Sequence, residues 1–351
     1  MAYPVVTGAV LIEATGAALN NAGQDEGRHV ENAIVVKQIR IGRYRYPYVS
    51  GQAWRRWWRE VLYEDFEWKP SPVTREAKSA YTEGNPVEYE DDDLFGYMAA
   101  RKARGGEGGT FRRVSPLKNS LLISVLPNVI TSDFESFSRN LPVDQPDPVP
   151  FEHEHYTTLL QGTFTVSLQD VGRFELGPMR DLPKEITLPD DMRRIVADNA
   201  RDADVAVLPL TKRQQRVSQL LSALARLRGG ANLTRNSTDV VPVVVLIAFL
   251  DGGNAPLQNL FTPNDTGEAV QLNLQRLRSV LRDYRDRLLK PEGSEHSFFF
   301  GYRPGVLANE EEVLQALSAG ELEGVKFYIG DPGQVVLQAA EQAKKLVPEV
   351  G

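Results

Sequence analysis

A cationic stretch at the start of a predicted helix holds residues suited to binding an anion. From Tyr46 to Glu60 the sequence is YPYVSGQAWRRWWRE, in which three tryptophans and three arginines occupy six consecutive positions. Ser50 is a good helix N-cap, and Gly51 lets a ligand approach the backbone closely. Gln52 falls in the first turn, where unpaired N–H groups and the helix dipole favour an anion. These features favour phosphate binding.

The arginines of this stretch fit two interpretations. At 100° per residue the three tryptophans share one arc of a helix with Val61 and Leu62, and the three arginines point the opposite way. Arg55 and Arg59 are one turn apart, about 6 Å, which suits successive phosphates. An amphipathic helix with a solvated charged side would show the same pattern. The role of Arg56, at the edge between the two faces, stays open.

Charge is predicted to be segregated in this chain. The net charge is −7, which argues against bulk attraction to nucleic acid unless the charges are grouped. Ahead of the helix, apolar and basic residues alternate in a ribbon that contains Lys37, Arg40, Arg43 and Arg45, and the segment from Tyr81 to Asp93 is strongly acidic. We therefore expect one basic and one acidic face.

Composition limits the possible chemistry and location. The chain has no cysteine, which excludes disulfides, thiolate nucleophiles and cysteine-based metal sites. The apolar stretch after Met1 lacks a basic n-region and ends at Glu13, so neither a signal peptide nor a membrane span is predicted. We expect a soluble cytoplasmic protein without a membrane partner.

The predicted fold class is α+β. The segments Val5–Ala14, Arg113–Pro127, Thr163–Gly177 and Asp239–Leu250 have strand character, and helical periodicity begins at Ser50 and again near Leu210. Without insertions the order is strand, helix, strand, strand, helix, strand, the βαββαβ pattern of a ferredoxin-like or RNA-recognition-motif-like (RRM-like) palm. We expect one such domain over residues 1–351, with a finger insertion at 64–112, a thumb hairpin at 129–157, for which Asp133–His155 is the candidate, and a helical C-terminal addition at 263–351.

Metal binding and catalysis are weakly supported. His153 and His155 share one face of a possible strand, but two ligands do not make a site. The run Asp91–Asp93 in a polar insertion is expected to be solvated. The sequence shows no convincing catalytic arrangement, so we expect no metal, no cofactor and no enzymatic activity.

Several segments resemble a known family. The pattern Ser-x-Gln-x-x-Arg-Arg-x-x-Arg, beginning at Ser50, is similar to the helix motif of the CRISPR-associated backbone subunit of type I Cascade (Cas-seven type, RAMP superfamily). The segments ALNNAGQDEGR, NAIVVKQIR and YPYVSGQAWRRWWRE resemble the type I-B branch, the DevR autoregulator family. RVSPLKNSLLISVLP and FEHEHYTTLLQGTFTVSLQDVGRF are similar to further family segments, so the resemblance covers most of residues 1–262.

The resemblance implies a non-catalytic subunit that polymerises head-to-tail along a CRISPR RNA and presents it for pairing with target DNA, together with other Cascade subunits. It implies an RRM-like palm with finger and thumb insertions. The motif match assigns phosphate contacts to Ser50, Gln52, Arg55 and Arg59, and a looser match places three residues in a loop that approaches RNA: Asn20, Asn21 and Arg28.

Two alternatives stay open. One is a stand-alone RNA-binding or transcription-autoregulatory protein. The other is an RNA-cleaving relative with an acidic residue in a loop, for which Asp25 is the candidate. With the ribbon and the neighbouring Gly51 and Arg56, the predicted RNA-binding set is Asn20, Asn21, Arg28, Lys37, Arg40, Arg43, Arg45, Ser50, Gly51, Gln52, Arg55, Arg56 and Arg59.

Overall fold

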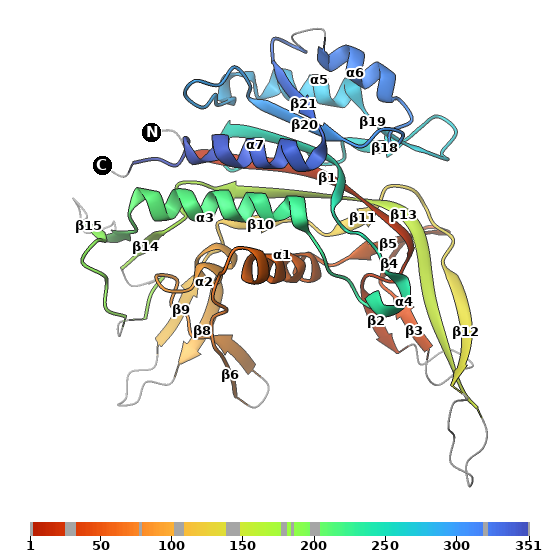
Figure 1. The fold of residues 1–351 in the computed structure, drawn as a ribbon, viewed down its shortest axis with the longest axis horizontal. Coiled ribbons are helices and arrows are strands. Elements are labelled where there is room, and N and C mark those ends of the chain that lie inside the picture. Colours follow the sequence, from red (N-terminus) through yellow and green to blue (C-terminus); the bar gives the residue numbers. More distant parts are fainter. Residues whose placement is uncertain are drawn as a thin grey trace.

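The computed structural model describes residues 3–24, 33–76, 79–101, 109–137, 148–176, 181–183, 186–196, 204–318 and 322–349. A large mixed sheet runs through the molecule and supports layers of helices on both faces (Figure 1). Its strands follow the order β21 (Phe327–Gly330), β20 (Phe298–Tyr302), β17 (Pro242–Asp251), β1 (Pro4–Ala17), β13 (Val149–Ser167), β11 (Leu122–Ser124), β5 (Tyr44–Val49) and β4 (Gln38–Ile41).

The central strands are buried on both faces. On β1, Val6, Val10 and Ile12 join one hydrophobic core, whereas Ala9 and Leu11 join the other. The neighbouring β17 alternates in the same way. Because successive side chains of a strand point to opposite faces, a two-sided core requires a nearly continuous apolar run, as these two segments have.

Helices α1 (Gly51–Asp65), α3 (Leu210–Ser222) and α7 (Pro332–Lys344) cover one face. The predicted tryptophan face of α1 is confirmed, since Trp54, Trp57 and Trp58 are all buried. The Trp58 indole stacks on Trp54 at 5.7 Å between ring centroids, meets Phe164 edge-on, and donates Nε1–H to the Leu220 carbonyl at 2.6 Å. These contacts fix the orientation of α1 on the sheet.

The other face is covered by a C-terminal lobe. It contains β18 (Phe261–Pro263), β19 (Val270–Leu272), α5 (Leu274–Asp283), the short 3-10 helix η2 (Arg285–Arg287) and α6 (Glu310–Ser318). The segment 263–351, expected to be a helical addition, also supplies the sheet strands β20 and β21. It is therefore part of the central architecture.

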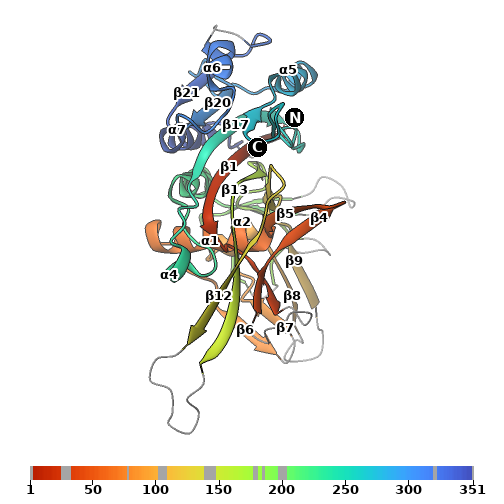
Figure 2. The ribbon, with the colours of Figure 1, turned by 90° about the vertical axis from the view of Figure 1, so that its right-hand side faces the viewer.

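Two projections extend from the body on either side of α1 (Figure 1). The segment 64–112 contains the hairpin of β6 (Val73–Glu76) with β7 (Ser79–Thr82) and the short helix α2 (Glu90–Phe95). The hairpin of β8 (Tyr97–Arg101) with β9 (Gly109–Arg113) follows α2 and ends one residue beyond this segment. The segment 129–157 contains β12 (Thr131–Phe137), which pairs antiparallel with the first part of β13 (Figure 2). β13 continues from this projection into the main sheet.

The remaining elements are short. β2 (Asn21–Gln24) and β3 (Ala33–Val36) pair beside β13, and β10 (Leu117–Asn119) pairs with β13. β14 (Arg173–Glu175), β15 (Arg193–Ile195) and β16 (Val205–Val207) form a small sheet. The 3-10 helix η1 (Ala223–Arg226) follows α3, and α4 (Leu233–Asn236) follows later. No helix in the described ranges is long and apolar enough to cross a membrane.

Candidate nucleic-acid interface

The start of α1 is held in a defined position by side-chain hydrogen bonds. Ser50 has extended backbone angles, and its Oγ accepts from the Ala53 N–H at 3.3 Å, which is the predicted N-cap. The Ser50 N–H donates to Asn20 Oδ1 at 2.9 Å. Asn20 therefore positions the helix start, a structural role that its loop location did not reveal.

A cleft of about 670 Å³ opens at this helix start. It lies between the first turns of α1, the end of α2 and strand β10. Its lining consists of Ser50, Gly51, Gln52, Arg55, Arg59, Phe95, Gly96, Ser115, Leu117, Lys118, Asn119 and Leu121. The structure thus brings the predicted motif together with residues about forty and sixty positions further along the chain.

Arg55 does not point freely outward. Its Nη1 donates to the Leu117 carbonyl at 2.9 Å and to Asn119 Oδ1 at 3.1 Å, and its Nη2 donates to the Phe95 carbonyl at 2.6 Å and to Ser115 Oγ at 2.9 Å. Burial and the neighbouring Arg59 charge lower the pKa of Arg55 to about 10, so the group stays cationic at neutral pH. The predicted outward orientation is wrong for this residue, because surrounding oxygens draw it into the wall of the cleft.

Arg59 is the more available cation. Its guanidinium lies over the Phe95 ring at 4.2 Å from the centroid, and it has no hydrogen-bond acceptor among the described residues. Burial lowers its pKa, an effect opposed by the nearby Asp91 and Asp92. A guanidinium stacked on a ring is preorganised while its N–H groups stay open to an anion.

Arg56 belongs to a different environment. Its side chain is 78% exposed and Nε donates to Glu60 Oε1 at 2.8 Å, an (i, i+4) pair on the solvent side of α1. Gln52 is also exposed, in the first turn. Arg56 therefore fits the interpretation of a solvated charged face of α1, whereas Gln52 lies at the mouth of the cleft.

The structure explains the glycine at position 51 by close packing, whereas the sequence predicted that it lets a ligand approach. A Cβ at this position would lie 3.2 Å from Asn119 Nδ2 and 3.4 Å from the Ser120 carbonyl. Asn119 Nδ2 also donates to the Gly51 carbonyl at 3.2 Å. The glycine therefore allows α1 to pack closely against the end of β10, at Asn119 and Ser120.

Lys118 and Asn119 were not predicted as site residues. Lys118 is exposed on β10 and lines the cleft, and Asn119 joins Arg55 to Gly51. Lys118 lies 59 positions from Arg59 by numbering, within a segment whose family resemblance was already evident. A single lysine in a short strand shows no sequence pattern that would predict a binding residue.

The basic ribbon is an antiparallel hairpin that leads into the cleft. Arg40 on β4 lies opposite Arg45 on β5, and the positive φ of Gly42 closes the turn. Arg43 is exposed and stacks on Tyr44 at 5.2 Å. The Lys37 backbone bonds to the Asn20 carbonyl and to the Tyr48 N–H, which ties the hairpin base to the helix start.

The remaining loop predictions have separate outcomes. Asn21 begins β2, and its Oδ1 is buried without a hydrogen-bond partner among the described residues.

Two further predicted loop residues, Arg28 and Asp25, lie outside the described residues. His153 and His155 lie on β13, and no group of three or more potential metal ligands occurs within the described ranges.

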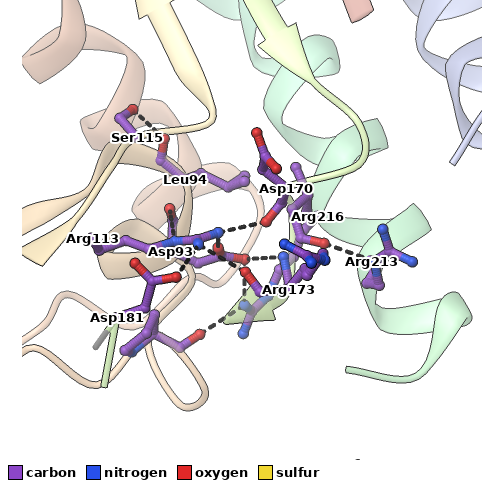
Figure 3. Close-up of polar contacts among 12 residues, drawn as sticks. Asp93, Leu94, Arg113, Ser115, Asp170, Arg173, Asp181, Arg213 and Arg216 are labelled. Carbon is purple, nitrogen blue, oxygen red and sulfur yellow. Dashed lines mark hydrogen bonds and ion pairs between the residues drawn. The ribbon is translucent and has the colours of Figure 1, made fainter. Parts of the chain in front are cut away.

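The acidic run Asp91–Asp93 is buried, which corrects the prediction of a solvated segment. Asp91 accepts from the Tyr63 hydroxyl at 2.6 Å, and Asp92 accepts from Ser71 Oγ at 2.8 Å. Asp93, fully buried, pairs with two guanidiniums from distant parts of the chain, Arg113 at 2.6 Å and Arg216 at 2.7 Å (Figure 3). Asp91 and Asp93 fasten the projection to α1 and α3, whereas Asp92 bonds within the projection, and the three carboxylates do not form an acidic face.

The Asp93 cluster extends through further hydrogen bonds. Arg113 also pairs with Asp181 at 3.2 Å and donates to the Arg173 carbonyl at 2.8 Å. Arg216 donates to the carbonyls of Pro86 and Val87. Because most donors of both guanidiniums have partners, this network is internal framework and offers little to a ligand.

Comparison with known proteins identifies the family. Residues 6–260 match the family of the CRISPR-associated negative auto-regulator DevR/Csa2. The chain belongs to this family. The matched range includes α1, the cleft and both projections of this DevR/Csa2 member, and it ends before the C-terminal lobe. No curated protein is similar to it in sequence.

Solved structures share the fold of this DevR/Csa2 member. A chain of a CRISPR RNA-guided surveillance complex superimposes with a TM-score of 0.52 at 12% identity, over 97% of this chain and 99% of that chain. A chain of a CRISPR RNA-guided surveillance complex in a pre-nicking state gives a TM-score of 0.50 at 12% identity, over 96% and 99%. The likeness therefore includes the C-terminal lobe.

Proposed function

We propose that this DevR/Csa2 member is the CRISPR RNA-binding backbone subunit of a type I-B Cascade complex and holds the guide RNA by its phosphates at the start of α1. The observation that carries the proposal is the cleft, which combines a helix N-terminus with Arg59 and Lys118. An anion there would meet unpaired backbone N–H groups as well as two side-chain cations. Contacts of this kind are independent of base sequence, as a guide-binding subunit requires.

The residues of the cleft would act in two ways. Arg59 and Lys118 would contact phosphate directly, with Gln52 beside the first turn. Arg55, whose guanidinium already binds four acceptors, would hold the walls of the cleft together and add positive charge from within the wall. The β4–β5 hairpin would extend the positive surface along the RNA through Arg40, Arg43 and Arg45.

The sheet topology supports an RRM-like palm. The strands β17, β1, β13 and β11 are neighbours in that order, and each pairs antiparallel with the next. With α1 after β1 and α3 after β13, this corresponds to the order four, one, three, two of the ferredoxin-like pattern. The projection 64–112 would then be the finger and 129–157 the thumb.

A backbone role also predicts assembly. Copies of the subunit would polymerise head-to-tail along the guide in the cytoplasm and present it to target DNA, together with other Cascade subunits. A heterologous interface of this kind repeats without closing, so the RNA would set the length of the filament.

We propose a binding role without catalysis. The described lining of the cleft consists of cations, amides, hydroxyls and apolar groups, with neither a carboxylate nor a histidine among them. General acid–base hydrolysis of RNA commonly uses a carboxylate or an imidazole, and the described lining of the cleft supplies neither. This composition supports phosphate binding as the role of the cleft.

The direct test is co-purification of the protein with a CRISPR RNA, followed by native mass spectrometry. We expect multimers whose mass increases with guide length. A nucleic-acid-free monomer that ignores the RNA would contradict the assembly and leave a stand-alone RNA-binding protein as the alternative.

The cleft itself is tested by Arg59→Gln combined with Lys118→Gln. RNA affinity should fall for every sequence, and the dependence of log affinity on log salt should become shallower by roughly 2, because two phosphate contacts are removed. Arg56→Gln, on the solvated side of the same helix, is the matched control and should leave the slope unchanged. Equal salt slopes for the parent, the double variant and Arg56→Gln would show that the cleft does not contact the RNA.

A further inference from the structure

The C-terminal lobe carries a second concentration of arginines. In α5 the apolar residues Leu274, Leu277 and Leu281 pack into the lobe, so the charged positions face outward. Figures 1 and 2 both place α5 at one end of the molecule, on the other side of the central sheet from α1. The charged residues from 274 to 290 are Arg276, Arg278, Arg282, Arg285, Arg287 and Lys290, against Asp283 and Asp286.

Three of these arginines lie along one side. Arg278 and Arg282 are an (i, i+4) pair, about 6 Å apart, and both approach Glu323. Arg285 follows in the next turn, and its guanidinium lies against Gly324, where a Cβ would be 2.6 Å from Arg285 Nη2. The row of three guanidiniums therefore borders the turn at Glu323–Gly324.

The counter-charge beside this row is incomplete. Glu323 Oε1 lies 3.8 Å from Arg278 Nη1 and 3.9 Å from Arg282 Nη1, beyond hydrogen-bonding distance. None of the three guanidiniums has a hydrogen-bond acceptor within the described part of the chain, and Glu323 is the one described carboxylate that forms an ion pair with them. Among the described residues, positive charge is thus left in excess, and the guanidinium donors meet no acceptor there.

We propose that Arg278, Arg282 and Arg285 form a second nucleic-acid surface, which binds a phosphodiester backbone separately from the guide cleft. Guanidinium groups match phosphate oxygens in charge and in the geometry of their N–H groups. A strand offers phosphates in series, which suits a row of cations at one-turn intervals. The large apolar side chains that are exposed in the described residues all lie outside α5–β21, so this surface lacks the anchors typical of a protein interface.

The experiment measures binding of labelled duplex DNA, single-stranded DNA and single-stranded RNA by fluorescence anisotropy over a range of salt. It uses the full chain, loaded with guide RNA if that complex forms. Arg278→Gln combined with Arg282→Gln should weaken binding on the order of ten-fold at low salt and make the salt slope shallower by roughly 2. The control is Arg194→Gln, an exposed arginine of β15 that is paired with Asp204 at 2.8 Å.

Glu323→Gln provides a test of opposite sign. Removal of its carboxylate leaves the arginine row uncompensated, so phosphate binding should become several-fold tighter at low salt. A purely structural role for these residues would not produce a gain. The substituted arginines lie at the surface and Glu323 is partly exposed, and thermal unfolding will verify that the variants stay folded.

The three probes separate the sources of phosphate. If the double variant loses affinity for duplex DNA alone, the surface binds a target duplex. If it loses affinity for only one kind of single strand, the surface binds that kind of strand. Unchanged affinity for all three probes in the double variant, or no gain in Glu323→Gln, would overturn the proposal. Arg59→Gln with Lys118→Gln should affect guide loading without changing the α5 response, so failure of the guide-binding proposal is distinguishable from failure of this one.

Discussion

The cleft at α1 and the network around Asp93 both contain arginines, but the arginines of the two regions serve different purposes. In the network, Arg113 and Arg216 are buried and paired with a fully buried carboxylate (Figure 3). In the cleft, Arg59 stacks on a ring and its N–H groups donate to no described residue, and Lys118 is exposed. Arg55 lies between these extremes, because it lines the cleft but binds four internal acceptors. The availability of a cation to a ligand depends on whether its donors are already satisfied.

The largest expected effect comes from removing the centre of the network. Asp93→Ala leaves two buried guanidiniums without their shared carboxylate and should lower the free energy of unfolding by about 3–5 kcal/mol. Chemical denaturation measures this. The control Asp191→Ala breaks an exposed pair with Lys212 at 2.9 Å, and should change stability by less than about 1 kcal/mol. Similar losses in the two variants would mean that Asp93 does not hold the projection to the body.

Arg55 and Arg59 should separate stability from binding. Arg55→Ala leaves the carbonyls of Phe95 and Leu117 without their donors and should cost about 1–3 kcal/mol in unfolding free energy. Arg59→Ala loses a cation–π contact and the attraction to Asp91 and Asp92 but no hydrogen bond to a described residue, so it should destabilise the protein less than Arg55→Ala, while its RNA affinity falls and its salt slope becomes shallower by roughly 1. If Arg59→Ala unfolded as easily as Arg55→Ala and still bound RNA normally, the two roles would have been assigned wrongly.

The same reasoning applies to two stacked tryptophans. Trp58→Phe removes the indole bond to the Leu220 carbonyl, whereas Trp54 Nε1 is buried without a partner among the described residues. Both changes reduce ring volume, so Trp58→Phe should be less stable than Trp54→Phe by about 1 kcal/mol. Thermal unfolding of the two variants provides the comparison, and the reverse order would contradict the hydrogen-bond assignment.

The smallest effect concerns pH. Burial raises the pKa of Asp91 above its ordinary value of 3.8, and the Tyr63 hydroxyl and Arg59 partly oppose the shift while Asp92 adds to it. A carboxyl with a raised pKa in the folded state stabilises the protein below pH 3.8, and that contribution is lost as pH rises through the folded-state pKa. Relative to Asp91→Asn, the parent should therefore lose unfolding free energy as pH increases from about 4. A constant difference across this range would show that burial does not control this group.

The parts of the fold that depend on local pattern could be predicted. The tryptophan face of α1 follows from helical periodicity, and the strands near Val5–Ala14 and Asp239–Leu250 follow from their continuous apolar character. The C-terminal strands were missed, because β20 is only five residues long and its neighbouring helices dominate the pattern there.

The parts that depend on distant partners could not be predicted. The burial of Asp93 depends on Arg216, 123 positions away. Arg55 appeared free because its acceptors on α2 and β10 lie 40 to 64 positions away. Lys118 became a candidate once the fold placed β10 beside α1. A charged residue in an isolated sequence does not reveal whether a partner will meet it.

The continuous strand β13 has a mechanical consequence. It runs from Val149 to Ser167 without a break, about 60 Å at the usual rise per residue, and joins the β12 projection to the centre of the sheet. A single extended strand has no hinge, so a pull at the far end is transmitted directly to its ladder with β1. A load along the strand acts on those hydrogen bonds in shear, all together and not one after another. The projection should therefore behave as a stiff lever whose displacement the central sheet must follow.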